Sequence, residues 1–164
     1  LEEAAAPVQR CKDNLRTLGV ALRAGSLPET GEPTFELGED EIEIGLGVHG
    51  EMGVERMALI PADEIVVKML DTIVADLPYE SGDRVALLVN NLGSTTPMEL
   101  MIVNRKAREV LAEQGIEVVR SDIGGYFLSQ EMAGFSISLL KLDDELEKLL
   151  AAPCRSVPYT QPQL

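Results

Sequence analysis

Metal-binding side chains and reactive thiols are scarce in this sequence. It contains one histidine, two cysteines and no tryptophan among 164 residues. Cys11 and Cys154 lie near opposite ends and share no metal-ligand spacing, so a structural zinc site is not expected. A disulfide between the two ends is one alternative, and a reduced chain is the default expectation. No apolar run approaches the roughly 18 residues that span a membrane.

Positive charge is also scarce. The chain has 14 Lys and Arg against 28 Asp and Glu, which gives a formal net charge of −14. Because phosphate groups are bound by clustered Lys and Arg, this balance argues against nucleic acids and anionic membranes as partners. It is also poorly suited to binding a free nucleotide without a metal or another chain. The simplest role of the acidic surface is solubility.

Length and composition, with 45% hydrophobic and 26% charged residues, indicate one globular domain with a substantial core. The chain begins Leu-Glu-Glu-Ala, with neither an initiator methionine nor a signal-peptide pattern. We therefore expect a cytoplasmic protein of which this chain is one part. We expect the domain to span residues 1–152, followed by a proline-rich tail or linker at 153–164.

Apolar periodicity predicts an α/β fold in which a mixed, largely buried sheet is flanked by helices. Helices are expected at residues 2–16, with a break near Pro7, and at 61–77, 97–114 and 143–150. Strands are expected at residues 18–22, 34–37, 41–44, 57–60, 84–90, 116–120 and 136–142. The almost continuous apolar run at 84–90 is typical of a strand covered on both faces. The strand–helix–strand order from 84 to 120 predicts a parallel pair.

Local signals support the two central helices. Thr96 and Glu99 have the spacing of a capping box, and Gly115 stands where a helix C-terminus favours glycine. The helix expected at 61–77 carries an apolar stripe that is typical of core packing rather than of a cofactor site. The stripe consists of Ile65, Met69, Ile73 and Leu77.

Three loops rich in glycine or asparagine each follow a β-type run. They lie at residues 45–53, 90–96 and 122–127, and a helical turn is expected within 129–135. Loops gathered at one rim of an α/β core are an ordinary place for a binding site. The first loop contains His49, the only histidine of the chain, among four glycines.

Several familiar sites are excluded by these loops. No Gly-Lys-Ser or Gly-Lys-Thr occurs, so there is no P-loop. Residues 45–50 have the glycine spacing of a dinucleotide-binding turn, but a strand pattern follows where that turn should open a helix. No serine lies in a nucleophile-elbow context.

His49 has one economical chemical use. A neutral imidazole nitrogen can add to an electrophilic carbonyl carbon and form a covalent hemiaminal. An ordinary pKa of about 6.5 leaves most of the ring neutral near pH 7. Glu51 either orients that ring or faces solvent. The alternative is a glycine-rich hairpin in which the histidine is incidental.

Gly-Val-His-Gly-Glu at residues 47–51, together with an ordered set of other short segments, resembles the C-terminal half of the dihydroxyacetone kinase substrate-binding subunit. This segment is the most specific one, and the resemblance covers nearly the whole chain. The matching segments are 35–37, 40–41, 43–51, 62–64, 89–93, 98–100, 131–134 and 139–146.

The resemblance implies that His49 is both the catalytic and the substrate-binding residue. It would hold dihydroxyacetone as a hemiaminal while a hydroxyl of the substrate is phosphorylated to dihydroxyacetone phosphate, a step of glycerol metabolism. Glycerol has no carbonyl and cannot be captured in this way. Anchoring also fixes the hydroxyl for phosphoryl transfer, which is a positioning effect.

The resemblance further implies what this chain does not contain. Acid/base residues belong to a preceding α/β domain, the missing N-terminal half of the same subunit. ATP or ADP with magnesium is expected on a partner subunit or fused domain, and some relatives draw phosphate from the phosphotransferase system instead. This domain is expected to bind neither cofactor nor metal, to form a homodimer, and to be nearly inactive alone. The alternatives are a dihydroxyacetone-sensing coactivator and a purely structural dimerisation domain.

Overall fold

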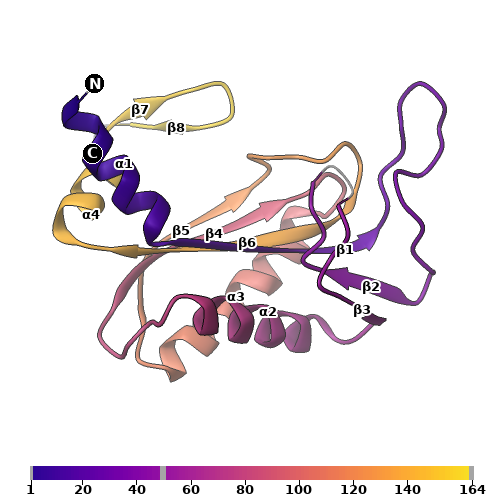
Figure 1. Cartoon of the computed structure of the whole chain (residues 1–164), viewed down its shortest axis with the longest axis horizontal. Helices are drawn as coiled ribbons and strands as arrows, with labels where there is room; N and C mark the ends of the chain where they lie inside the picture. The colour runs from indigo at the N-terminus through magenta and orange to yellow at the C-terminus, as the bar shows by residue number, and fades with distance from the viewer. Residues whose placement is uncertain (1, 49–50, 163–164) are drawn as a thin grey trace.

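A computed structural model describes residues 2–48 and 51–162 of the chain (Figure 1). Within these residues, a six-stranded sheet crosses the molecule in the order β3-β2-β1-β6-β4-β5. The helices are α1 (Glu2–Asp13), α2 (Ala62–Asp76), α3 (Pro97–Glu113) and α4 (Asp144–Leu150). The sheet strands are β1 (Leu15–Arg23), β2 (Glu41–Ile44), β3 (Glu55–Ala58), β4 (Arg84–Asn91), β5 (Glu117–Gly124) and β6 (Ala133–Leu142).

The sheet is mixed, as predicted. β4 and β5 pair in parallel through the crossover helix α3, and the other neighbouring strands pair antiparallel. The parallel pair confirms the prediction from the strand–helix–strand order. The α/β fold class, with a mixed sheet and flanking helices, is therefore confirmed.

α2 and α3 cover one face of the sheet, below it in Figure 1. Ile65, Met69 and Ile73 of α2 are buried against this face, so the predicted stripe is core up to the end of the helix. Full burial of each such side chain stabilises the fold by roughly 1.5–3 kcal/mol. Leu77 follows the last turn as the C-cap and is half-buried.

The predicted ends of α3 are confirmed. The Thr96 hydroxyl accepts a hydrogen bond from the Glu99 N–H, and the Glu99 carboxylate accepts one from the Thr96 N–H. These reciprocal bonds satisfy donors that a helix N-terminus otherwise leaves unpaired. Gly115 follows the C-cap with φ +74°, a conformation that glycine adopts without strain.

The first helix is shorter than predicted and is not broken at Pro7. α1 runs through Pro7, where the missing N–H removes one intrahelical bond early in the helix. It ends at Asp13, because Leu15 and Arg16 pair with Leu140 and Leu139 of β6 instead of continuing the helix. Sheet pairing overrides the helical propensity of this segment.

The strand predicted at residues 34–37 is wrong. These residues form no strand, because both edges of β2 are already paired, with β1 and with β3. Phe35 and Leu37 pack instead into a second small core, where they cover a cluster of four buried side chains. That cluster consists of Ala21, Leu46, Leu92 and Met132.

Two boundaries near the third loop are also wrong. Asp122, Ile123 and Gly124 extend β5 beside β4, so the loop begins at Gly125. The predicted helical turn at 129–135 is a single turn, closed by the Met132 N–H donating to the Ser129 carbonyl at 3.0 Å. From Ala133 onward the chain belongs to β6, whose long pairing with β1 and β4 outweighs helix formation.

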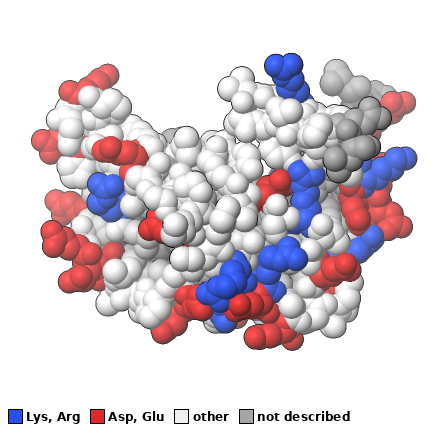
Figure 2. Space-filling view, turned by 180° about the vertical axis from the view of Figure 1, so that it is seen from behind, with Lys and Arg blue, Asp and Glu red and all other residues white. Residues whose placement is uncertain are grey.

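Helices do not cover the opposite face of β4, contrary to the prediction from its apolar run. Val85, Leu87 and Val89 are buried against the helices, whereas Ala86 and Leu88 on the other face are half-buried. α1 and α4 rise from this face at one end, and the loops after β1 and β2 rise at the other (Figure 1). From behind, uncharged surface forms a hollow between the two raised ends (Figure 2).

Part of the segment predicted to be a tail or linker forms a hairpin, β7 (Cys154–Arg155) and β8 (Thr160–Gln161). Arg120 of β5 donates hydrogen bonds to the Tyr159 hydroxyl and to the Gln161 side chain, and its guanidinium lies 5.7 Å from the Tyr159 ring centroid. The hairpin is therefore joined to the sheet. In the described parts of the chain, no helix has the length and apolarity needed to cross a bilayer.

Candidate functional site

The loop between β2 and β3 is closed at its neck by backbone hydrogen bonds. The Gly45 N–H donates to the Gly19 carbonyl at 2.7 Å, and the Val54 N–H donates to the Ile44 carbonyl at 2.8 Å. Gly45 has φ +82°, and a Cβ there would lie 2.8 Å from Val54 Cγ2. Only glycine fits this turn without displacing its neighbour.

A buried carboxylate strengthens the same neck. Glu43 is only 4% exposed, and its carboxylate accepts hydrogen bonds from the Gly53 N–H at 2.6 Å and from Arg56 Nη2 at 2.7 Å. Burial by itself opposes ionisation of Glu43, but the bonds from Gly53 and Arg56 outweigh it and lower the pKa of the carboxyl. An ionised Glu43 thus ties the end of the loop to the strand before it.

The loop after β4 reaches the third loop through Asn90. This side chain is 3% exposed, and its Oδ1 accepts hydrogen bonds from the Tyr126 and Phe127 N–H groups, each at 2.9 Å. Its Nδ2 donates to the Phe127 carbonyl at 2.7 Å. One buried amide therefore fixes the turn that follows β5.

Ser129 joins these loops to the first one. Its N–H donates to the Leu92 carbonyl at 2.7 Å, and its hydroxyl donates to the Val48 carbonyl. The second core adds apolar contact, since Leu46 and Val48 pack with Leu92 and Met132. The expectation that three loops gather at one rim is confirmed for their described residues.

The gathered loops enclose a cavity of about 260 Å³. Its volume is below the range of about 300–1,000 Å³ that is typical for drug-sized ligands, so it suits a small molecule. Its described lining has no charged side chain and offers the hydroxyls of Thr17 and Ser136 together with backbone groups. The lining consists of Thr17, Leu18, Gly19, Gly45, Leu46, Gly47, Val48, Leu92, Phe127 and Ser136.

His49, the predicted catalytic and substrate-binding residue, lies outside the described residues. The residue before it in the chain, Val48, lines the cavity. Glu51 follows two positions later, and its main-chain carbonyl accepts a hydrogen bond from the Gly47 N–H at 3.0 Å. A Cβ on Gly47 would collide with the Glu51 carboxylate, so this glycine leaves space for that side chain. A role for Glu51 in orienting the histidine ring stays a prediction.

Residues 2–48 and 51–162 contain no group of three or more His, Cys, Asp or Glu arranged to hold a metal ion. Both cysteines are free thiols in the structure.

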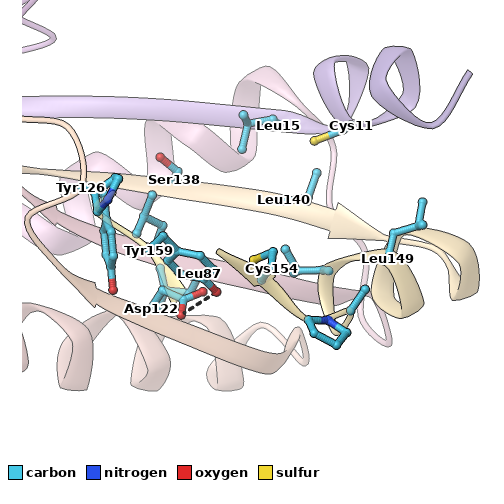
Figure 3. A pocket seen from close by; sticks show the side chains of 16 residues that line it. Cys11, Leu15, Leu87, Asp122, Tyr126, Ser138, Leu140, Leu149, Cys154 and Tyr159 are labelled. Carbon is cyan, nitrogen blue, oxygen red and sulfur yellow. Dashed lines mark hydrogen bonds between the residues drawn. The ribbon is translucent and has the colours of Figure 1, made fainter. Parts of the chain in front are cut away.

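A second and larger hollow lies on the same open face of the sheet (Figure 3). It has a volume of about 490 Å³ and is bounded by Leu15 of β1, Leu140 of β6, Leu149 of α4 and Tyr159 before β8. Cys11 and Cys154, distant in sequence, both line it. We call this hollow the apolar groove, because aliphatic side chains dominate its wall. Asp122, Tyr126 and Ser138 also line it.

Sequence reasoning assigned no role to Glu43, Asn90 or Ser129. Glu43 and Asn90 did carry a signal, because each is a polar residue within or at the end of a buried strand pattern. Such residues need partners when buried. Ser129 carried none, since the carbonyl that it binds lies 81 positions away in the sequence.

The fold and the site define an α/β domain with a small cavity beside three loops, and the described lining of this cavity carries no charged side chain. The sequence profile of the Dak1 domain matches residues 1–158, nearly the whole chain, and the chain therefore belongs to the Dak1 domain family. The match continues past residue 152 into the hairpin.

Relatives of known name support this assignment. The chain is 38% identical over 151 residues to the dihydroxyacetone-binding subunit DhaK of a PTS-dependent dihydroxyacetone kinase from Listeria innocua, covering 92% of this chain and 45% of the relative. It is 42% identical over 157 residues to triokinase/FMN cyclase of Rattus norvegicus, covering 93% of this chain and 27% of that protein.

A solved structure, the dihydroxyacetone kinase operon co-activator Dha-DhaQ, superposes with a TM-score of 0.87 at 28% identity. The alignment covers 93% of this chain and 48% of the co-activator. The chain thus spans less than half the length of each of these three relatives.

Proposed function

We propose that this chain is the substrate-anchoring domain of a dihydroxyacetone kinase, in which His49 holds dihydroxyacetone covalently as a hemiaminal. One observation carries the proposal. Three loops converge on a small cavity whose described lining has no charged side chain and includes Val48, the residue that directly precedes the only histidine. The names of the relatives, which include a dihydroxyacetone-binding subunit, supply the substrate class.

The chemistry requires only a neutral imidazole and a ketone. A ring nitrogen donates its lone pair to the carbonyl carbon, and the carbon–oxygen π electrons move to the oxygen. The oxygen takes up a proton while the ring loses its N–H proton, so the net change is addition of N–H across C=O. No oxidant or metal is needed, and a described lining without charged side chains matches an uncharged substrate.

Phosphoryl transfer needs groups that the described lining does not provide. A free hydroxyl of the anchored substrate attacks the phosphoryl donor, and covalent anchoring keeps that hydroxyl in place. We assign the donor, ATP or ADP with magnesium or a phosphotransferase-system protein, to a partner subunit or fused domain. Acid/base residues are assigned to the N-terminal half of the same subunit, and a homodimer is the expected assembly. This chain alone should show little or no kinase activity.

Labelled substrate tests the anchor directly. Dihydroxyacetone carrying ¹³C at the ketone carbon should show, on addition of this chain, a new resonance in the region of an sp³ carbon. The His49→Ala variant should leave the ketone resonance unchanged. Since the chain has a single histidine, loss of the signal in this variant assigns the adduct to one residue.

Crystals of the complete protein give an independent test. Dihydroxyacetone soaked into them should produce continuous density between a His49 ring nitrogen and the former ketone carbon. Separate, noncovalent density would contradict the anchoring role. Turnover measured with the donor partner should show a sharply raised substrate requirement for His49→Ala, and unchanged kinetics would remove this residue from the mechanism.

A second candidate is a dihydroxyacetone-sensing coactivator that binds the ketone without phosphorylating it. The superposition on the co-activator, with a TM-score of 0.87, supports this candidate, and a dihydroxyacetone kinase superposes with a similar TM-score of 0.84. Both candidates use the same anchor, so the ¹³C experiment does not separate them. Adduct formation without turnover, in the complete protein supplied with its donor, would identify the coactivator.

A further inference from the structure

Ser129 occupies the point where the three loops of the cavity meet. Its hydroxyl donates to the Val48 carbonyl of the first loop, and its N–H donates to the Leu92 carbonyl of the second at 2.7 Å. Its own carbonyl accepts the Met132 N–H at 3.0 Å, which closes the turn of the third. The side chain is half-buried, so water competes only partly for these bonds.

The segment that carries Ser129 is hydrogen-bonded to the end of β4. Asn90, at the end of β4, accepts two backbone N–H bonds and donates one bond within residues 126–127. Because Asn90 is buried at the end of β4, its hydrogen bonds hold residues 126–127 against this strand. The Ser129 hydroxyl therefore belongs to a segment that is hydrogen-bonded to the sheet.

The partner of that hydroxyl is a particular peptide group. The Val48 carbonyl belongs to the peptide that joins Val48 to His49, and a peptide group is planar. Holding the carbonyl oxygen thus restricts the direction in which the chain leaves Val48. Val48 also lines the cavity, so the restriction acts at its wall.

We propose that Ser129 is a positioning residue for the substrate anchor: its hydroxyl, by holding the Val48 carbonyl, sets the placement of His49 for addition to the ketone. This inference rests on the proposed function and goes beyond it by naming a residue 80 positions away that the reaction depends on without contact to substrate. Ser129 takes no part in proton transfer or bond formation.

Three variants of this chain test the inference. Ser129→Ala removes the hydroxyl, and Ser129→Thr retains a hydroxyl at the same position. Ser156→Ala is the matched control, because the Ser156 hydroxyl also donates to a backbone carbonyl, that of Tyr159 at 3.2 Å, but in the distant hairpin. Urea unfolding of all three confirms that they are folded before substrate is added.

The fraction of ¹³C-labelled dihydroxyacetone held as hemiaminal is the first readout. Ser129→Ala should lower the equilibrium constant for adduct formation about fivefold, the factor that one hydrogen bond of ordinary strength contributes. Ser129→Thr should stay within about twofold of the parent, and Ser156→Ala should not change it. A Ser129→Ala variant with the parental constant would overturn the inference, as would equal losses in Ser129→Ala and Ser129→Thr.

The imidazole resonances of His49 are the second readout and need no substrate. With one histidine in the chain, labelled histidine gives a single set of ring signals. Ser129→Ala should shift these signals, and Ser156→Ala should not. If the parent forms no adduct, the proposed function fails, and the positioning role for ketone addition fails with it even if Ser129→Ala shifts the ring signals. If the parent forms the adduct and neither readout responds to Ser129→Ala, the positioning role fails alone.

Discussion

The two hollows on the open face of the sheet are built in different ways. The cavity of about 260 Å³ is lined by three loops and by residues of β1 and β6, and its loops are held by hydrogen bonds from Asn90, Ser129 and Gly45. The apolar groove, of about 490 Å³, is bounded by side chains such as Leu15, Leu140 and Leu149. One hollow is defined by directional bonds and the other by apolar surface.

The two kinds of wall suit different roles. A wall held by hydrogen bonds suits a chemical reaction, and an apolar wall suits packing. Hydrogen bonds fix atoms at particular distances and angles, so a cavity built from them can hold a reacting carbonyl in one orientation. An apolar surface contributes free energy in proportion to the area that is covered and selects no particular atom. The larger hollow is therefore the less specific one, so size alone does not identify the site that we propose.

The largest expected effect compares the covered and open faces of the sheet at adjacent positions of β6. Leu139 is fully buried beneath the helices, whereas Leu140 is half-buried beside the apolar groove. Leu139→Ala should lower the free energy of unfolding by about 3 kcal/mol through the cavity that it leaves. Leu140→Ala should lower it by only about 1 kcal/mol, because this side chain is already partly solvated.

Urea unfolding of the two variants measures this contrast in one strand with one type of substitution. Equal losses in both variants would mean that the groove side of the sheet is packed as tightly as the helix side. That result would contradict the division into a covered and an open face.

The next largest loss of stability is expected at the neck of the loop between β2 and β3. Glu43→Gln keeps an acceptor for the Gly53 N–H but removes the charge that faces Arg56. Since hydrogen bonds to charged groups are stronger than neutral ones, we expect a loss of about 1–2 kcal/mol in the free energy of unfolding at pH 7. Glu39→Gln, an exposed carboxylate in the turn before β2, controls for the change in net charge.

The same variant predicts a pH dependence. The pKa of Glu43 is lowered in the folded state, so its stabilising effect is fully present above the ordinary pKa of 4.5 and is lost as pH falls through the lowered value. The stability difference between the parent and Glu43→Gln should therefore shrink in acid. A difference that stays constant from pH 7 to the acid transition would show that the carboxylate charge does not stabilise the neck.

The smallest effect is expected at the outer wall of the groove. Arg120→Ala removes the bonds to Tyr159 and Gln161 that join the hairpin to β5. Because ion pairs and bonds near the surface contribute little, the global loss should be below about 1 kcal/mol. Amide hydrogen exchange across residues 154–161 should nevertheless become faster, since the hairpin can open without unfolding the sheet.

Arg105→Ala serves as the control for Arg120→Ala, because Arg105 is ion-paired on α3 with Glu109 and Asp63, away from the hairpin. Its exchange pattern across residues 154–161 should match the parent. Unchanged protection in Arg120→Ala would mean that contacts other than Arg120 hold the hairpin in place.

Local patterns in the sequence predicted much of the fold. The capping box at Thr96 and Glu99, the glycine at 115 and the stripe led by Ile65 were each confirmed, because they depend on neighbours within one helix. Predictions failed where residues distant in the sequence decide whether a segment joins the sheet. Leu15 joins β1 because Leu140 lies beside it, and Phe35 leaves the sheet because β2 has no free edge.

The sequence by itself determined the α/β class and drew attention to His49, since helical and strand periodicity are local and a single histidine among glycines is visible without a fold. Tertiary structure alone decided that one face of β4 stays open, and that Ser129 holds the Val48 carbonyl from 81 positions away. The physical reason is the same in both cases. Periodicity records which side chains avoid water, whereas the partner of a hydrogen bond or of a sheet face depends on how distant segments meet.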